Sequence, residues 1–192
     1  MQAISKIWWK ARCSARQFRT DIRAIAATEF AVIVPLMLVM FFGTVEFSSA
    51  VAIDRKVTLM ARTLSDLTSQ STSVADTDMT NFFNASTGIM TPYASALALS
   101  TISELYVDPT TKVARVQWSK GSAARTQGTT VSIPTTLAIG GTYLIFSEVS
   151  YTYTPSVGFV LKSGIPLNDV AYTRPRQSLC VFYSPSTACT TY

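Results

Sequence analysis

One uncharged, mostly apolar stretch constrains this 192-residue chain more than any other feature. Between Glu29 and Glu46 there is no charged residue, and between Arg23 and Arg55 there is no Lys or Arg. About 20 apolar residues, each adding about 1.5 Å to an α-helix, cross a hydrocarbon core of about 30 Å. We therefore predict a single transmembrane segment over residues 25–47, with acidic residues only near its edges.

The apolar residues beyond this span indicate that the helix continues outside the membrane. They recur with a 3-4-3-4-3 spacing, which is typical of a helix with one buried face: Ala50, Ile53, Val57, Met60, Leu64 and Leu67. One interpretation is a single helix that faces lipid to Phe47 and buries one stripe beyond it. The alternative is an anchor helix followed by a separate surface helix. Within the span, Pro35 lacks an N–H, so we expect a helix kink there.

The charge of the chain is concentrated before the span. The first 23 residues contain six Lys or Arg and one Asp, which equals the whole net charge of +5. The positive-inside rule then places residues 1–24 as a basic leader in the cytoplasm and the chain beyond the span in the periplasm. We expect an inner-membrane protein whose partners include membrane lipid. Because no basic face remains outside the leader, nucleic-acid binding is not expected.

A cleaved secretory signal is a second interpretation of the same N-terminus. A basic region, an apolar region and Ala50-Val51-Ala52 together resemble a signal with a cleavage site. The unusually long basic region and Glu46-Phe47, where small residues normally stand, count against this interpretation.

The three cysteines fit this topology. Cys13 lies in the leader on the reducing side, whereas Cys180 and Cys189 lie nine positions apart in the external part. Two cysteines in an oxidising compartment commonly pair, so we expect a disulfide between Cys180 and Cys189.

After the span the pattern changes from helical to β. Residues 48–92 form a helical region that continues the anchor helix, including a short helix over 76–90, and residues 93–192 form an antiparallel β-rich region. Strands are predicted over 97–107, 112–119, 131–137, 143–154 and 176–183, and a long loop over 155–172. Helices first and strands later predict an α+β fold, with an antiparallel sheet covered on one face by the long helix.

The residue types needed for most catalytic sites are missing. The sequence contains no His, so the commonest general base and metal ligand is absent. No Gly-rich phosphate loop follows a strand, and no Ser lies in a nucleophile elbow. We therefore predict no catalytic residues, no cofactor, no metal site and no small-molecule substrate.

Several segments of the chain resemble the TadE/TadG-like family, pilin-like assembly proteins of the tight-adherence (Flp) type IV pilus machinery. The segments that carry the resemblance begin with Thr28-Glu29-Phe30-Ala31-Val32-Ile33-Val34-Pro35-Leu36 and Glu46-Phe47, and continue with Asp54-Arg55-Lys56-Val57, Leu64-Ser65-Asp66-Leu67, Val116-Gln117-Trp118-Ser119, Ile133-Pro134, residues 148–155 and Arg174-Pro175-Arg176. They cover most of the chain.

The resemblance implies roles for three residues near the start of the span. It implies a prepilin-peptidase junction between Ala24 and Ile25, with Ala24 standing where the family usually has Gly. It also implies that Glu29 pairs with the cationic N-terminus of a neighbouring subunit. The alternative for Glu29 is that its carboxylate reaches back to the cytoplasmic headgroups beside Arg23.

Two functions compete at this point. The resemblance implies a non-catalytic minor pilin or assembly factor whose partners are other pilins, inner-membrane pilus-assembly proteins and prepilin peptidase. The alternative is a bitopic envelope receptor whose periplasmic domain binds a ligand.

Overall fold

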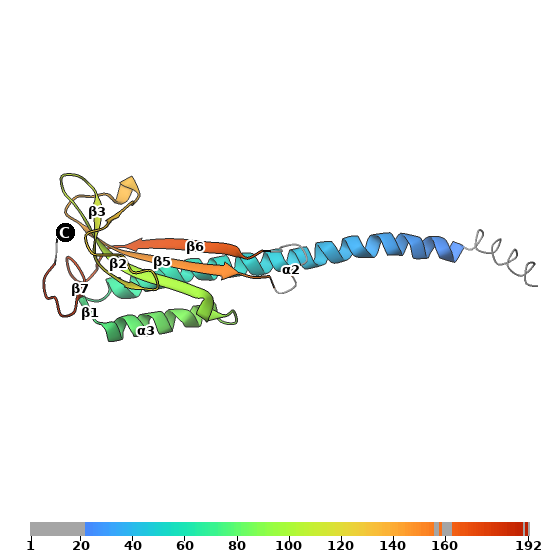
Figure 1. Ribbon diagram of the computed structural model, residues 1–192, viewed down its shortest axis with the longest axis horizontal. Coiled ribbons are helices and arrows are strands. Elements are labelled where there is room, and N and C mark those ends of the chain that lie inside the picture. The colour runs from blue at the N-terminus through green and yellow to red at the C-terminus, as the bar shows by residue number, and fades with distance from the viewer. Residues whose placement is uncertain (1–21, 156–157, 159–162, 190, 192) are drawn as a thin grey trace, which may run out of the picture.

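The computed structural model describes residues 22–155, 158, 163–189 and 191. A long helix forms a stalk that ends in a folded domain (Figure 1). The helices are α2 (Ile22–Ser69) and α3 (Asp76–Thr87), with 3-10 turns η1 (Gly88–Met90), η2 (Ser95–Leu97) and η3 (Thr135–Leu137). The strands are β1 (Ser73–Val74), β2 (Ala98–Val107), β3 (Ala114–Gly121), β4 (Thr130–Val131), β5 (Tyr143–Tyr153), β6 (Ile165–Thr173) and β7 (Phe182–Tyr183).

Helix α2 is one continuous helix of 48 residues. It passes through Pro35 and enters the domain without a break (Figure 1). The prediction of a single helix is therefore confirmed, and the alternative of a separate surface helix is wrong. The helix ends where the polar residues Gln70, Ser71 and Thr72 follow, and the hydroxyl of Thr68 donates to the carbonyl of Leu64 in its last turn at 2.9 Å.

The domain is built on a five-stranded sheet in the order β4-β3-β2-β5-β6. All four pairings are antiparallel. Helix α2 packs along one face, against β5 and β6, and α3 lies beside α2 (Figure 1). The predicted α+β fold, with an antiparallel sheet packed against helices, is confirmed.

The stripe predicted on α2 forms much of the main core. Ile53, Val57, Met60 and Leu64 are each at most 1 % exposed and pack against residues from β2, β5 and the C-terminal part of the chain. Leu67 is only half-buried, because at the end of the helix Thr68 occupies the inward position. Burying four such side chains contributes roughly 1.5–3 kcal/mol each relative to exposure, so this half of α2 is fixed to the sheet.

A second, smaller core lies on the other face of the sheet. Leu105 and Val107 of β2 pack there with Val116, Leu144 and Phe146. The segment from β4 to η3 covers it with half-buried apolar residues: Val131, Ile133 and Leu137. Both faces of the distal part of the sheet are therefore covered.

Three predicted boundaries are wrong. The loop expected over 155–172 contains β6, whose Pro166, Asn168 and Asp169 are poor strand formers that an edge strand tolerates. The strand expected over 176–183 is limited to β7, which pairs in parallel with β1. The strand expected over 131–137 ends at Val131, before Pro134 and η3.

Candidate functional site

The N-terminal half of α2 is an exposed apolar surface. From Ile25 to Val45 no described residue is buried, and the large side chains are open to the surroundings: Phe30 is 69 % and Val32 75 % exposed. The helix Ile25–Ser69 is long and apolar enough to cross a membrane, and its most apolar window is 0 % buried by the protein. A contiguous exposed apolar surface of this kind marks a membrane or protein contact, whereas a core helix of a soluble protein would be covered.

Glu29 is an exposed carboxylate near the start of this surface. It lies on α2 one turn after Ile25, whose carbonyl accepts the Thr28 hydroxyl at 2.8 Å. Among the described residues, no ion pair includes Glu29. Its pairing role and the processing junction at Ala24 and Ile25 stay predictions, and residues 1–21, which include Cys13, lie outside the described residues. The kink at Pro35 likewise stays a prediction.

The change of surroundings along α2 begins at Glu46. Read from the N-terminus, it is the first buried residue of α2, at 3 % exposure, and the Tyr153 hydroxyl donates to its backbone carbonyl at 3.3 Å. The sequence indicated only an acidic residue at the edge of the span. The domain therefore begins to cover the helix at the residue where the predicted span ends.

At the opposite end of the domain, a C-terminal segment (residues 176–189) lies over the end of α2 and over β2 and β3. Backbone N–H groups of Arg176, Phe182 and Ser184 donate to the carbonyls of Ser69, Thr72 and Val74 at 2.9–3.1 Å. A disulfide joins Cys180 to Cys189, whose Cα atoms are 5.8 Å apart. The segment thus ties the C-terminal part of the domain to the end of α2 and to β1.

A buried carboxylate holds the C-terminal segment to the sheet. Glu104 of β2 is 3 % exposed, and its Oε1 accepts the backbone N–H of Val181 at 2.6 Å. The indole N–H of Trp118 donates to the Val181 carbonyl at 2.8 Å. Burial raises the pKa of Glu104 from 4.5 to about 7, and hydrogen bonds from Val181 and Trp118 partly oppose that rise.

A pocket of about 550 Å³ lies beside this contact. Glu104, Gln117 and Trp118 line it from the sheet, Arg125 and Gln127 from the β3–β4 loop, and residues 181–186 and Ala188 from the C-terminal segment. Its size suits a small ligand. However, no buried side-chain nitrogen or oxygen lacks a hydrogen-bond partner in the part of the chain that the structure describes. Glu104, Trp118 and Arg125 of the lining already bind other parts of the domain.

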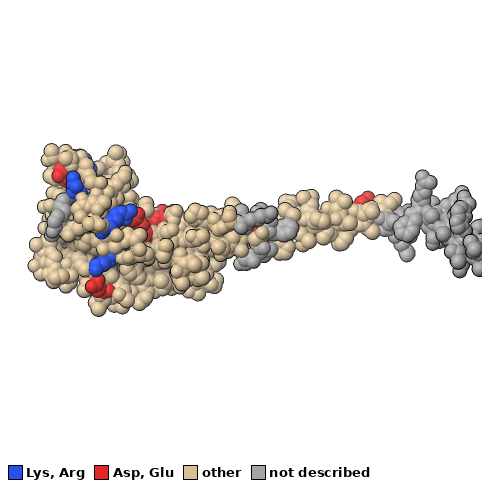
Figure 2. Space-filling view, viewed as in Figure 1, with Lys and Arg blue, Asp and Glu red and all other residues tan. Residues whose placement is uncertain are grey.

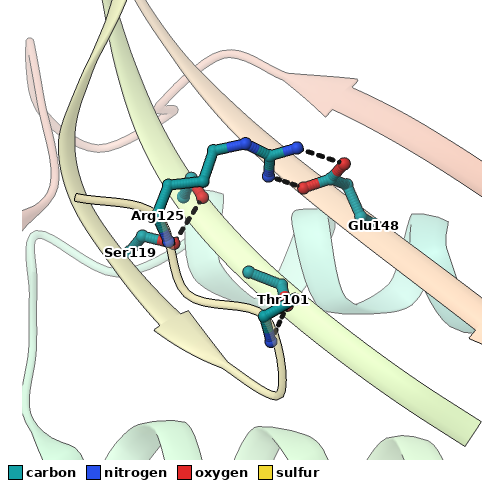
Figure 3. Close-up of polar contacts among 6 residues, drawn as sticks. Thr101, Ser119, Arg125 and Glu148 are labelled. Atoms are coloured by element: carbon teal, nitrogen blue, oxygen red, sulfur yellow. Dashed lines mark hydrogen bonds and ion pairs between the residues drawn. The ribbon is translucent and has the colours of Figure 1, made fainter. Parts of the chain in front are cut away.

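An ion pair fixes the β3–β4 loop to the sheet (Figure 3). The guanidinium of Arg125 makes two contacts with the Glu148 carboxylate, one of them from Nη2 to Oε1 at 2.8 Å. The same loop donates backbone N–H groups to the Ser119 and Thr101 hydroxyls, from Arg125 and Ala123 at 2.9 and 3.0 Å (Figure 3). Because both charged side chains are about 30 % exposed, the pair stabilises the loop only modestly.

Sequence reasoning missed Glu104 and the Arg125–Glu148 pair. The one sequence signal that could have indicated a special role for Glu104 was its position as an isolated acidic residue in the apolar strand 98–107. That strand is buried on both faces, so alternation could not indicate which way Glu104 points. No group of three or more His, Cys, Asp or Glu side chains that could hold a metal ion occurs among the residues that the structure describes.

Comparison with known proteins finds a family match that lies within α2. Residues 24–64, about a fifth of the chain, match the family model described as TadE-like protein. No curated protein and no solved structure matches the chain. The match runs from the first residues of α2 through the exposed half to Leu64 in the domain core, so it covers both halves of the helix. The resemblance read from the sequence is therefore confirmed: in its N-terminal segment this chain is similar to the TadE-like family of pilus proteins.

Proposed function

We propose that this chain is a non-catalytic, membrane-anchored pilin-like protein that acts in the assembly or stabilisation of a tight-adherence (Flp) type IV pilus. The observation that carries the proposal is the exposed, TadE-like half of α2 joined without a break to a folded domain. In this proposal residues 25–47 cross the inner membrane, the leader is cytoplasmic and the domain is periplasmic. Its partners are other pilins and inner-membrane assembly proteins.

The role that we propose for Glu29 is pairing with the N-terminus of a neighbouring subunit. An unpaired carboxylate near the hydrocarbon core is costly, and a neighbouring α-ammonium would offset that cost. Cleavage after Ala24 would create such an ammonium on Ile25, with a pKa of about 8 in the ordinary case. The exposed position of Glu29 on an otherwise apolar surface supports this role.

The experiment combines Glu29→Gln with N-terminal sequencing of the membrane-extracted protein. The amide keeps the shape and removes the charge, so insertion should persist while piliation and association with partner pilins fall. The matched control is Asp54→Asn, which neutralises an exposed acidic residue on α2 beyond the span. Normal piliation in Glu29→Gln, with Met1 or Gln2 still at the N-terminus, would remove the pairing role.

A receptor function has one observation in its favour, the pocket beside Glu104. Because Glu104 and Trp118 already bind the chain's own Val181, that observation is weaker than the match along α2. Loss of piliation in a deletion strain, restored by the intact chain, would support the assembly role over the receptor.

A further inference from the structure

Among the residues that the structure describes, the part of the domain next to the stalk carries few charges. Between Asp78 and Glu104 the sequence contains no charged residue, and this stretch includes η1, η2 and the start of β2. On the face shown in Figure 2, the charged side chains of the domain gather on the half away from the stalk, and the half beside it shows almost none.

Three hydrogen bonds between α2 and β5 fix the position of the sheet along the helix axis. The Ser65 hydroxyl donates to the Ile145 carbonyl at 3.3 Å, the Ser147 hydroxyl to the Ala61 carbonyl at 2.5 Å, and Tyr153 to Glu46 at 3.3 Å. From Ser147 to Tyr153 a strand advances about 20 Å, and from Ala61 to Glu46 a helix advances about 22 Å. The two estimates agree, so β5 runs side by side with α2 toward the predicted membrane boundary.

This alignment places the start of β2 close to that boundary. Ala98 pairs with Tyr151, which lies two strand residues, or about 7 Å, from the level of Tyr153 and Glu46. A bilayer adds about 5–7 Å of headgroup layer on each side of its hydrocarbon core. Leu97, just before Ala98, therefore falls within the headgroup layer when the span ends at residue 47, and Leu99, which pairs with Ser150 about 10 Å from the level of Tyr153, falls just beyond it.

Apolar side chains are exposed at this level. Leu97 of η2 is 47 % exposed and Leu99 of β2 is 55 % exposed. On α2, Phe47 is 69 % and Val51 is 37 % exposed. We call these four residues the membrane-proximal collar. The next turn of α2 carries Asp54 and Arg55, both exposed, so charge returns where the headgroup layer would end.

We propose that the membrane-proximal collar rests in the headgroup layer of the bilayer that α2 crosses, so that lipid is the partner of this end of the domain. The collar continues the exposed apolar surface of the span, and its four side chains carry no charge whose desolvation would oppose entry into the headgroups. The contact would hold the domain at a defined height on the membrane. This proposal rests on the membrane span in the proposed function, but it does not depend on the pilus role or on Glu29.

The test measures the depth of a spin label attached to single cysteines in the full chain. Leu97→Cys reports on the collar in a Cys13→Ser background, and Ile139→Cys, 48 % exposed before β5 at the far end of the domain, is the matched control. Leu38→Cys reports on insertion of the span. The protein is placed in phosphatidylcholine nanodiscs at one copy per disc, and collisions with oxygen and with the aqueous reagent nickel-EDDA are measured.

The expected result is a several-fold lower nickel-EDDA accessibility and a higher oxygen accessibility at position 97 than at position 139. Equal accessibility at the two positions, with position 38 protected, overturns the proposal. An unprotected position 38 also overturns it, because the span itself would then be absent. Protection of position 97 only in discs that hold several copies assigns the collar to a neighbouring chain and overturns the lipid contact.

Discussion

The two halves of α2 differ in how their apolar residues are arranged and in what surrounds them. From residue 30 to 45 apolar side chains cover all sides of the helix, and the protein buries none of them. From residue 50 to 69 most of them form one stripe, of which Ile53, Val57 and Leu64 are almost completely buried, while Val51 and Leu59 are exposed. The difference teaches that the arrangement of apolar residues, on all sides or in one stripe, indicates whether a helix meets lipid or its own domain.

The largest expected effect comes from one substitution made in each half. Leu64→Ala removes a side chain that is 0 % exposed, so it should lower the domain's free energy of unfolding by about 2–5 kcal/mol. Leu38→Ala removes a side chain that is 46 % exposed and outside the domain, so it should leave that free energy unchanged. The measurement is a urea titration in detergent, followed by near-ultraviolet circular dichroism.

Equal losses in the two variants would contradict the comparison. They would mean that the first half of α2 also packs against the domain. An unchanged free energy in Leu64→Ala would instead mean that the second half is not part of the core.

The next effect concerns the far end of the domain, where Glu104 holds the C-terminal segment. Its pKa rises on folding from 4.5 to about 7, so the folded state binds the proton more tightly than the unfolded state. The domain should therefore be most stable at about pH 4.5 and lose on the order of 3 kcal/mol as the pH rises to about 7. Asp76 and Asp108, whose pKa values are lowered from 3.8, stabilise the folded state above that pH, and this contribution is lost only as the pH falls below it.

Glu104→Gln tests this pH dependence because the amide oxygen can still accept from Val181 but does not titrate. Urea titrations at pH 5 and pH 8 should give a stability difference in the unaltered chain and almost none in the variant. A slope that persists in Glu104→Gln would assign the pH dependence to another group. The insertion of α2, which this residue does not touch, is the internal control.

The disulfide should have a slightly smaller effect, confined to the same end. In the chain-entropy model a closed loop of about nine residues contributes about 2–3 kcal/mol. The double variant Cys180→Ser and Cys189→Ser should lose that amount while α2 still inserts. Mass spectrometry of the non-reduced protein should find the two cysteines bridged, and finding both thiols free would contradict the pairing.

Sequence reasoning predicted the helix better than the sheet. The stripe Ile53, Val57, Met60 and Leu64 was correct because a 3.6-residue period is read from local sequence alone. Strand β6 was missed because Pro166 and Asn168 argue against a strand, and only pairing with β5 makes one there. Whether a strand lies at the edge of a sheet depends on the whole fold, so no local sequence pattern could predict that β6 is an edge strand.

In the candidate site, too, some features could be predicted from local sequence and others depend on residues far away in the chain. The exposed half of α2 and the position of Glu29 could be predicted from the sequence, because a membrane span is defined by its own residues. The buried state of Glu104 could not, because Val181, 77 positions away, creates it. The same holds for Glu46, which Tyr153 covers from 107 positions away.

Reporter fusions after Ser73 and Ser186 test most directly whether α2 crosses the membrane and carries the domain to the far side. Ser73 follows the end of α2, and Ser186 lies in the C-terminal segment. Alkaline phosphatase should be active at both positions, while a cytoplasmic fluorescent reporter at either one should stay dark. A cytoplasmic readout at either position would contradict the account of one helix that passes from lipid into its own domain.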